Sequence, residues 1–152
     1  MDRTLDISAK IQILRPVQEV FEAIADPGKM THYFISESTG RMEAGRSLIW
    51  RFPEFDMDVP VEVGKVVNGS LITYRWDNEG MKTEVEIQLT AVADTATIVE
   101  VKEGSMKNDE RGIKWLKQNT EGWANFLCCL KGWVEYGINL RKGAFDFMRQ
   151  AG

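Results

Sequence analysis

The sequence predicts an α+β fold in which a curved antiparallel sheet of about six or seven strands wraps around one long C-terminal helix. Alternating apolar and polar residues, separated by short turn signals, recur from Leu5 to Glu103. Over Asn108–Tyr136 apolar residues instead recur at three- and four-residue spacing, which places them on one face of a helix. That face is rich in Trp, Phe and Leu and needs an apolar partner, which the sheet provides.

The first part of the chain predicts a strand followed by two short helices. Apolar and polar residues alternate over Leu5–Ile13, as in a strand with one buried face. The proline that opens Pro16–Ala25 favours the first turn of a helix there. Asp26–Gly28 ends that helix, because proline and glycine both interrupt helices. We expect a second helical turn over Met30–Phe34, and over Ser36–Gly45 a loop with a small edge strand.

The middle of the chain predicts a meander of antiparallel strands. Asn68–Gly69 is its strongest hairpin signal, because a tight primed turn needs positive φ, which these two residues tolerate best. Pro60 interrupts a strand pattern and therefore predicts an edge position or a bulge. The other turns are expected at Pro53–Glu54, Asp77–Gly80 and near Ala93–Asp94. The alternating apolar positions are Leu48, Trp50, Phe52, then Met57, Val59, Val61, Val63, then Ile72, Tyr74, Trp76, then Val85, Ile87, Leu89, then Thr97, Val99, Val101, with Glu103 in the same register.

Composition narrows the possible functions. The chain has 152 residues, a hydrophobic fraction of 43% and a formal net charge of -4. This length fits one domain over residues 1–152 with a core large enough to fold without disulfides or metal. The negative charge gives no basic field for nucleic acid or an anionic membrane. No apolar run has the length of a signal peptide or a membrane span, so we expect no membrane insertion and a cytoplasmic protein.

Few residues are suited to catalysis or metal binding. Cys128 and Cys129 are adjacent in the helical pattern, and neighbouring helical residues diverge by about 100° around the axis. We expect reduced thiols, with Cys129 beside the buried face and Cys128 outward, because a redox or metal pair would lack further ligands. His32, the single histidine, is expected at the surface or the rim of a site. The sequence therefore predicts no catalytic residue, no metal and no cofactor, and it favours a non-enzymatic role.

Inward-facing aromatic residues and two polar residues form the candidate ligand site. The rings could line a cavity between sheet and helix or could fill that space completely, and both interpretations are open. Glu103 falls in register with the buried positions of its strand, so it meets a donor such as Asn119 or Arg75, reaches water in a cavity, or lies where the strand end frays into solvent. The predicted ligand-binding residues are Trp50, Phe52, Phe55, Tyr74, Trp76, Val101, Glu103, Asn119, Trp123, Phe126, Leu127 and Leu130.

Glycines mark special positions near the C-terminus. Gly122, Gly132 and Gly137 each disfavour a helix by about 1 kcal/mol relative to alanine, which indicates a close backbone approach or a bend. Gly137 is also suited to end the helix. Beyond it, Phe145 and Phe147 are apolar, so we expect the tail to turn back and dock on the sheet or the helix.

The ordered signals resemble the SRPBCC (START/Bet v 1-like) superfamily, in the branch similar to the C-terminal domain of the activator of heat-shock protein 90 ATPase. The resemblance covers nearly the whole chain and implies a helix-grip fold. The resemblance is to one domain of the co-chaperone, and it therefore does not imply that this chain activates an ATPase. The matching residues are Pro16–Ile24 with Asp26–Pro27, Gly40 and Gly45 before Trp50, Leu71–Trp76, Thr97–Val101 with Glu103–Gly104, and Gly122–Trp123.

Three functions fit this resemblance. The favoured one is a non-enzymatic domain that binds a small hydrophobic or amphipathic ligand between the sheet and the last helix. The second is a protein-interaction module with a chaperone as partner, and it predicts an exposed apolar patch near Tyr33, Phe34 and the loop to Gly45. The third is an enzyme similar to aromatase/cyclases, in which Glu103 or His32 would act as acid or base. Either a monomer or a homodimer is compatible with the sequence.

Overall fold

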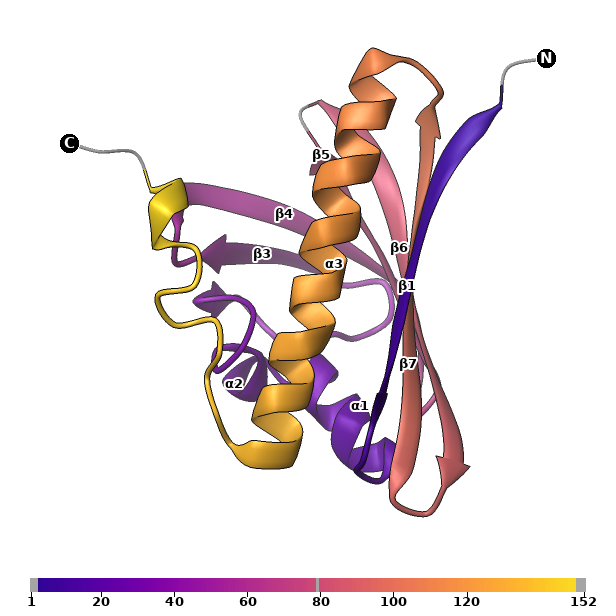
Figure 1. The fold of residues 1–152 in the computed structure, drawn as a ribbon, viewed down its shortest axis with the longest axis vertical. Helices are drawn as coiled ribbons and strands as arrows, with labels where there is room; N and C mark the ends of the chain where they lie inside the picture. The colour runs from indigo at the N-terminus through magenta and orange to yellow at the C-terminus, as the bar shows by residue number, and fades with distance from the viewer. Residues whose placement is uncertain (1–2, 79, 150–152) are drawn as a thin grey trace.

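The computed structural model describes residues 3–78 and 80–149 and shows a seven-stranded antiparallel sheet that curves around a long helix (Figure 1). The strand order is β1-β7-β6-β5-β4-β3-β2, so the first strand pairs with the last and the rest form a meander. This architecture confirms the predicted α+β helix-grip fold. The strands are β1 (Thr4–Ile13), β2 (Glu37–Ser38), β3 (Ser47–Phe52), β4 (Phe55–Val67), β5 (Leu71–Asn78), β6 (Met81–Ala93) and β7 (Ala96–Lys107).

Two short helices follow β1, as predicted, but the second begins earlier than expected. Helix α1 spans Val17–Ala25 and α2 spans Pro27–Met30. The Asp26 carboxylate accepts a hydrogen bond of 2.9 Å from the Gly28 amide and so caps α2. Pro27 therefore opens a new helix, because its missing N–H is not needed in a first turn. The turn after α2 carries Tyr33 and Phe34 into the core.

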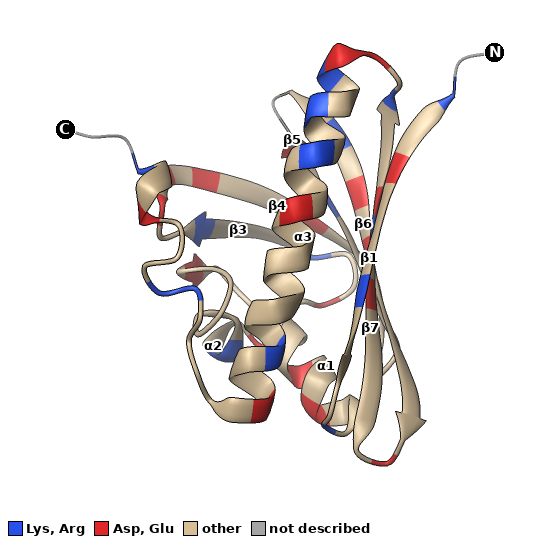
Figure 2. Cartoon of the chain, viewed as in Figure 1, with Lys and Arg blue, Asp and Glu red and all other residues tan. Residues whose placement is uncertain are grey.

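Helix α3 (Glu110–Tyr136) lies across the concave face of the sheet (Figure 1). Asp109 caps its start by accepting a hydrogen bond of 2.8 Å from the Gly112 amide. Gly137 ends it in the left-handed conformation at φ 66°, as the sequence predicted. Figure 2 shows an uncharged middle portion of this helix, with charged residues towards its two ends. The predicted face is buried through Trp123, Phe126, Leu127 and Leu130, and Trp115 near the start of the helix is buried as well.

The long hairpins of the sheet follow the predicted turns. Gly69 adopts φ 74° in the β4–β5 turn, where the Ser70 amide donates to the Val67 carbonyl. Pro60 pairs with Ile49 of β3, whereas the β4–β5 pairing starts only at Val61. Pro60 thus occupies a local edge, and the β4 irregularity lies further along, between Val63 and Val66. Glu79, in the predicted turn after β5, lies outside the described residues.

The core between the sheet and α3 is a cluster of aromatic rings in edge-to-face contact. Phe34 packs against Phe126 with ring centroids 4.7 Å apart and an interplanar angle of 74°. Trp50 meets Tyr74 at 5.2 Å and 64°, and Tyr74 meets Trp76 at 5.4 Å and 89°. Such pairs each add about 0.5–1.5 kcal/mol beyond the burial of their area. The aromatic residues therefore both stabilise the fold and form the walls of the space described below.

The chain after α3 turns back along the helix towards the β3–β4 end of the sheet (Figure 1). It ends in the 3₁₀ helix η1 (Asp146–Met148). The tail docks on α3 as predicted, through Leu140 against Gly132, whereas half-buried Phe145 lies 4.9 Å from the guanidinium of Arg141 in the same tail. Phe147 is 82% exposed, so the expectation that both phenylalanines dock was wrong for this residue. Arg141, and not Phe147, connects the tail to the sheet end of the protein, through its ion pair with Glu54.

Candidate functional site

A cavity of about 440 Å³ opens between α3 and the strands β3, β4 and β5. Its walls are mostly apolar and aromatic, with a few polar side chains among them, the composition typical of a small-molecule site. The sheet, the turn after α2, the helix α3 and the C-terminal tail all contribute. The lining residues are Phe34, Phe52, Phe55, Met57, Val59, Trp76, Asp77, Gln118, Asn119, Gly122, Trp123 and Arg141.

Gly122 leaves room for this cavity on the helix side. A Cβ atom built on Gly122 would meet no heavy atom within 4 Å, so the missing side chain is not required by close packing. Asn119 and Trp123 precede and follow it on the same wall. A glycine in the middle of α3 lowers helix stability and at the same time enlarges the open space. Glycine at this position therefore keeps the cavity open and is not required for close packing of the helix.

Glu103 lies behind this wall and holds the sheet and the helix together. Its carboxylate accepts hydrogen bonds from the indole Nε1 of Trp123 at 2.8 Å and of Trp76 at 2.9 Å. It also accepts from Thr83 Oγ1 at 2.5 Å and from Asn119 Nδ2 at 3.1 Å. Buried carboxylates are stabilised by multiple donors of this kind. Glu103 is 1% exposed, so the alternative that it frays into solvent was wrong.

Of the donors expected for Glu103, the structure confirms Asn119 but not Arg75. Arg75 points to the other face of the sheet, where its Nε donates to the exposed Glu84 at 3.4 Å. Adjacent residues of a strand point to opposite faces, which places Trp76 inward and Arg75 outward. Burial and, to a smaller extent, the negative charge of Glu103 raise the pKa of Tyr74 well above its ordinary value. The Tyr74 phenol therefore stays protonated and uncharged beside this carboxylate.

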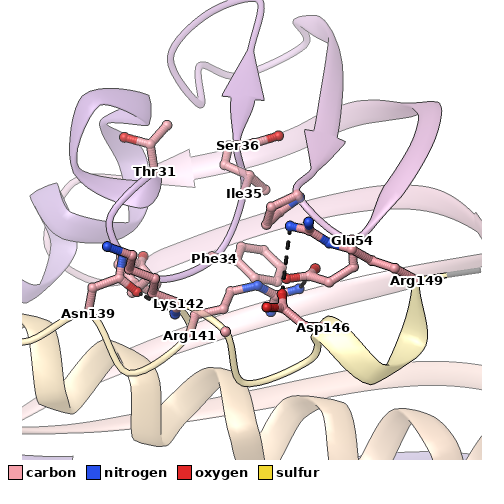
Figure 3. Close-up of a pocket in the computed structure, with 13 residues that line it drawn as sticks. Thr31, Phe34, Ile35, Ser36, Glu54, Asn139, Arg141, Lys142, Asp146 and Arg149 are labelled. Carbon is pink, nitrogen blue, oxygen red and sulfur yellow. Dashed lines mark hydrogen bonds and ion pairs between the residues drawn. The ribbon is translucent and has the colours of Figure 1, made fainter. Parts of the chain in front are cut away.

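A second, smaller cavity of about 190 Å³ lies on the other side of Arg141, under the C-terminal tail. Figure 3 shows the Arg141 side chain extending towards Glu54, with Phe34 beside the pair. Arg141 Nη2 donates to Glu54 Oε1 at 2.6 Å, and the two side chains are 15% and 3% exposed. Arg141 also lines the larger cavity, so it forms part of the partition between the two spaces.

The structure brings together part of the predicted ligand site. Phe52, Phe55, Trp76, Asn119 and Trp123 line the larger cavity. The other predicted residues lie in the surrounding core and do not line it; they are Trp50, Tyr74, Val101, Glu103, Phe126, Leu127 and Leu130. A ligand-binding role for these residues stays a prediction.

Several lining residues were not predicted from the sequence. Met57 and Val59 could have been predicted, because they belong to the alternating apolar positions that indicate the inner face of β4. Gln118 and Gly122 flank the predicted Asn119 on the helix. Arg141 follows no periodic pattern, and no signal in the sequence places it at the cavity.

The residues considered for chemistry lie elsewhere. His32 is exposed and stacks on Trp133, with ring centroids 4.1 Å apart and an interplanar angle of 6°. Cys129 is buried and Cys128 exposed, as predicted. Burial raises the pKa of the Cys129 thiol, an effect that nearby Arg141 partly offsets. Within residues 3–78 and 80–149 no three His, Cys, Asp or Glu side chains come together in a way that could hold a metal ion.

None of the helices in the described part of the chain has the length and apolar character needed to cross a membrane.

Solved structures share this fold over most of the chain. Protein SSP2350 from Staphylococcus saprophyticus is 30% identical, with a TM-score of 0.78 over 90% of this chain and 96% of that one. DynU16, a putative protein in the dynemicin biosynthetic locus, is 26% identical with a TM-score of 0.78. That match covers 88% of this chain and 48% of DynU16. The Aha1 dimer from Colwellia psychrerythraea shares the fold, with a TM-score of 0.74. It is 19% identical, and the match covers 88% of this chain and 98% of that one.

A comparison with proteins of curated function finds no significant match. The family model described as activator of Hsp90 ATPase homolog 1-like protein matches residues 15–135, from just after β1 almost to the end of α3. That span includes both short helices, the meander and the helix face that carries Trp123. The chain therefore belongs to the activator of Hsp90 ATPase homolog 1-like family.

Proposed function

We propose that this protein binds a small apolar or amphipathic molecule in the cavity between α3 and strands β3–β5, without transforming it. The observation that supports this most directly is the cavity itself, about 440 Å³ in volume and walled by aromatic rings. Glu103 holds two of those rings, Trp76 and Trp123, in place through their indole nitrogens. A wall whose side chains are fixed before binding costs less entropy when a ligand arrives.

A binding role also agrees with the chemistry around the cavity. The Glu103 carboxylate is engaged by four side-chain donors, which suits a structural role better than proton transfer to a ligand. The exposed His32 stacks on Trp133, and neither residue lines the cavity. DynU16, which resembles this chain, is a putative protein in a biosynthetic locus, and this setting is compatible with small-molecule binding.

Tryptophan fluorescence tests the proposal, because Trp76 and Trp123 line the cavity. A library of lipids and apolar aromatic compounds is titrated against the wild-type protein and the Gly122→Leu variant. The leucine side chain should occupy open space and weaken binding by about tenfold or more. Ala124→Leu adds an exposed leucine to the same helix and serves as the matched control. A library that changes neither fluorescence nor melting temperature of the wild type would refute the proposal.

A second candidate function is docking of a protein partner, which the likeness to a co-chaperone domain suggests. The patch expected around Tyr33 and Phe34 does not exist, because these side chains are 1% and 7% exposed. A different apolar patch is present near the β3–β4 turn, where Phe55, Met57 and Met148 are 41%, 58% and 47% exposed. Pull-down with the middle domain of heat-shock protein 90, together with an ATPase assay, tests this function. Absence of both contact and stimulation would exclude it.

A further inference from the structure

The C-terminal tail brings one cationic side chain to a mostly apolar cavity. Arg141 is the one basic residue among those that line the larger cavity, all of which lie in the described part of the chain. The tail is held at its start by the Ile138 amide, which donates to the Gly132 carbonyl at 3.1 Å, and by Leu140, which packs over Gly132. These contacts direct the next residue, Arg141, towards the aromatic wall.

The Arg141 guanidinium is surrounded by rings. Its central carbon lies 5.9 Å from the centroid of Phe34, 5.6 Å from that of Phe52 and 4.9 Å from that of Phe145. Aromatic faces attract cations, and the attraction strengthens when water is excluded. With 15% of its side chain exposed, Arg141 is largely desolvated. The geometry thus fixes a guanidinium at the border of the cavity.

Glu54 neutralises this guanidinium from the side away from the larger cavity. Glu54 lines the smaller cavity and a surface hollow by the β3–β4 turn, but it does not line the larger cavity. Its carboxylate takes one hydrogen bond from Nη2. A guanidinium has several further N–H groups, and among the described residues none of these has a hydrogen-bond partner. Nε in particular is buried and unpaired.

We propose that the Arg141–Glu54 pair is the polar anchor of the cavity and that it selects uncharged apolar molecules bearing an oxygen acceptor over carboxylates. The pair has no net charge, so the remaining N–H groups of Arg141 require a hydrogen-bond acceptor rather than a counter-ion. A carbonyl oxygen would supply one. A ligand carboxylate would place a second negative charge beside Glu54 in a poorly solvated site, and it would retain an uncompensated charge there.

Access to the buried Nε requires the tail to shift slightly, and the tail is suited to this. Arg141 and Phe145 are its half-buried residues, whereas Ile138, Leu140 and Met148 are about half exposed, at 52%, 49% and 47%. Segments with few buried contacts open locally at low free-energy cost. A ligand that offers an acceptor to Arg141 would therefore bind with a modest displacement of the tail.

Three naphthalene probes of similar size test this inference, which rests on the proposed function because it assumes that the cavity binds ligands. 2-Acetylnaphthalene offers an uncharged acceptor, 2-ethylnaphthalene offers none, and 2-naphthoate is an anion at neutral pH. Calorimetric titration of the wild type should show 2-acetylnaphthalene binding about tenfold more tightly than either of the others. This ranking requires no substitution and so cannot be confused with misfolding.

Two variants and a control locate the effect. Arg141→Met should make 2-acetylnaphthalene and 2-ethylnaphthalene bind within about threefold of each other, because the donor is lost and the apolar wall remains. Glu54→Gln removes the counter-charge and should improve 2-naphthoate binding by about tenfold, since Arg141 then carries a net positive charge. Arg149→Met, which removes a tail cation that is 56% exposed, should leave all three affinities unchanged.

The outcomes separate this inference from the function on which it rests. If wild-type protein binds 2-ethylnaphthalene but shows no preference for 2-acetylnaphthalene, or prefers 2-naphthoate, the anchor is refuted and the binding function stands. A preference that survives in Arg141→Met refutes the anchor as well. If none of the probes nor any library compound binds, the proposed function fails and the anchor fails with it.

Discussion

Glu103 on strand β7 accepts a hydrogen bond of 2.8 Å from the Trp123 indole on helix α3, so one buried carboxylate joins the two halves of the fold. The same carboxylate accepts from Trp76 on β5. Since both indoles line the cavity, the orientation of its walls depends on this carboxylate.

Glu103→Gln should destabilise the protein by about 3 kcal/mol, because an amide offers one acceptor oxygen where the carboxylate offers two, and its NH₂ group then faces donors. Urea unfolding followed by circular dichroism measures the loss. NMR should also show a shifted indole N–H signal for Trp76 or Trp123. Glu84→Gln on the outer face, where the carboxylate is 51% exposed, should change stability by less than about 0.5 kcal/mol. Equal effects of the two substitutions would contradict the structural role of Glu103.

Gly122→Ala and Gly112→Ala should change stability in opposite directions, although both lie in α3. A Cβ at Gly122 meets open space, so the alanine should stabilise the helix by about 1 kcal/mol. A Cβ at Gly112 would come within 1.9 Å of the Lys107 carbonyl oxygen, so that alanine should destabilise the protein. Melting temperatures measured side by side test both signs. A destabilised Gly122→Ala would show that this position is closely packed.

Gly132→Ala should loosen the C-terminal tail. The new Cβ would lie 2.6 Å from Cδ1 of Leu140, which forces the tail away from the helix. Trypsin should then cleave after Arg141 or Lys142 several times faster than in the wild type, because proteases act on locally opened segments. Shortening the opposing side chain in Gly132→Ala/Leu140→Ala removes the clash and should slow cleavage compared with Gly132→Ala alone. Cleavage at the wild-type rate in the single variant would show that Gly132 does not control tail docking.

The ion pair between Glu22 of α1 and Arg41 should make stability depend on pH in the acid range. Arg41 donates two hydrogen bonds, of 2.7 and 2.8 Å, and mainly through them lowers the pKa of Glu22 below its ordinary 4.5. A lowered folded-state pKa means that this stabilisation is present above the unfolded-state pKa and is lost as the pH falls through the folded-state value. The wild type should therefore lose part of its unfolding free energy as the pH falls through and below 4.5. In Glu22→Gln the difference between the unfolding free energies measured above and below this pH should be smaller.

Arg41→Met removes the donor and should reduce the acid sensitivity to the same extent. The double variant Glu22→Gln/Arg41→Met should add nothing further, because both single substitutions remove one shared interaction. Additive effects would instead attribute the pH dependence to other groups.

Iodoacetamide should modify Cys128 and leave Cys129 almost unlabelled in the folded protein. Cys128 is exposed, whereas Cys129 is buried and its pKa is raised by that burial, which keeps it in the unreactive thiol form. Mass spectrometry after labelling at mildly alkaline pH should show Cys129 reacting at least about tenfold more slowly. Cys128→Ser should abolish most of the labelling, and unfolding in urea should restore the reaction of Cys129. Rapid labelling of both thiols in the folded state would contradict this burial.

The helices, the strands and their buried faces follow from local sequence patterns. Alternation over Leu5–Ile13 and the helical spacing around Trp123 record which side of each element is buried, because the periods of strand and helix are local properties of the backbone. Asn68–Gly69 and Gly137 record where the chain must adopt positive φ. Periodicity and turn residues of this kind can be recognised without a structure, and the family resemblance depends on them.

The assembly of the site, in contrast, depends on contacts between residues that are far apart in the chain. Arg141 and Glu54 are separated by 87 positions in the chain, and they meet because the tail folds back over the β3–β4 end of the sheet. The choice of Asn119 rather than Arg75 as a partner for Glu103 likewise depends on which side chains face the same interior. Contacts of this kind depend on the packing of whole elements against one another, and local periodicity contains no information about that packing.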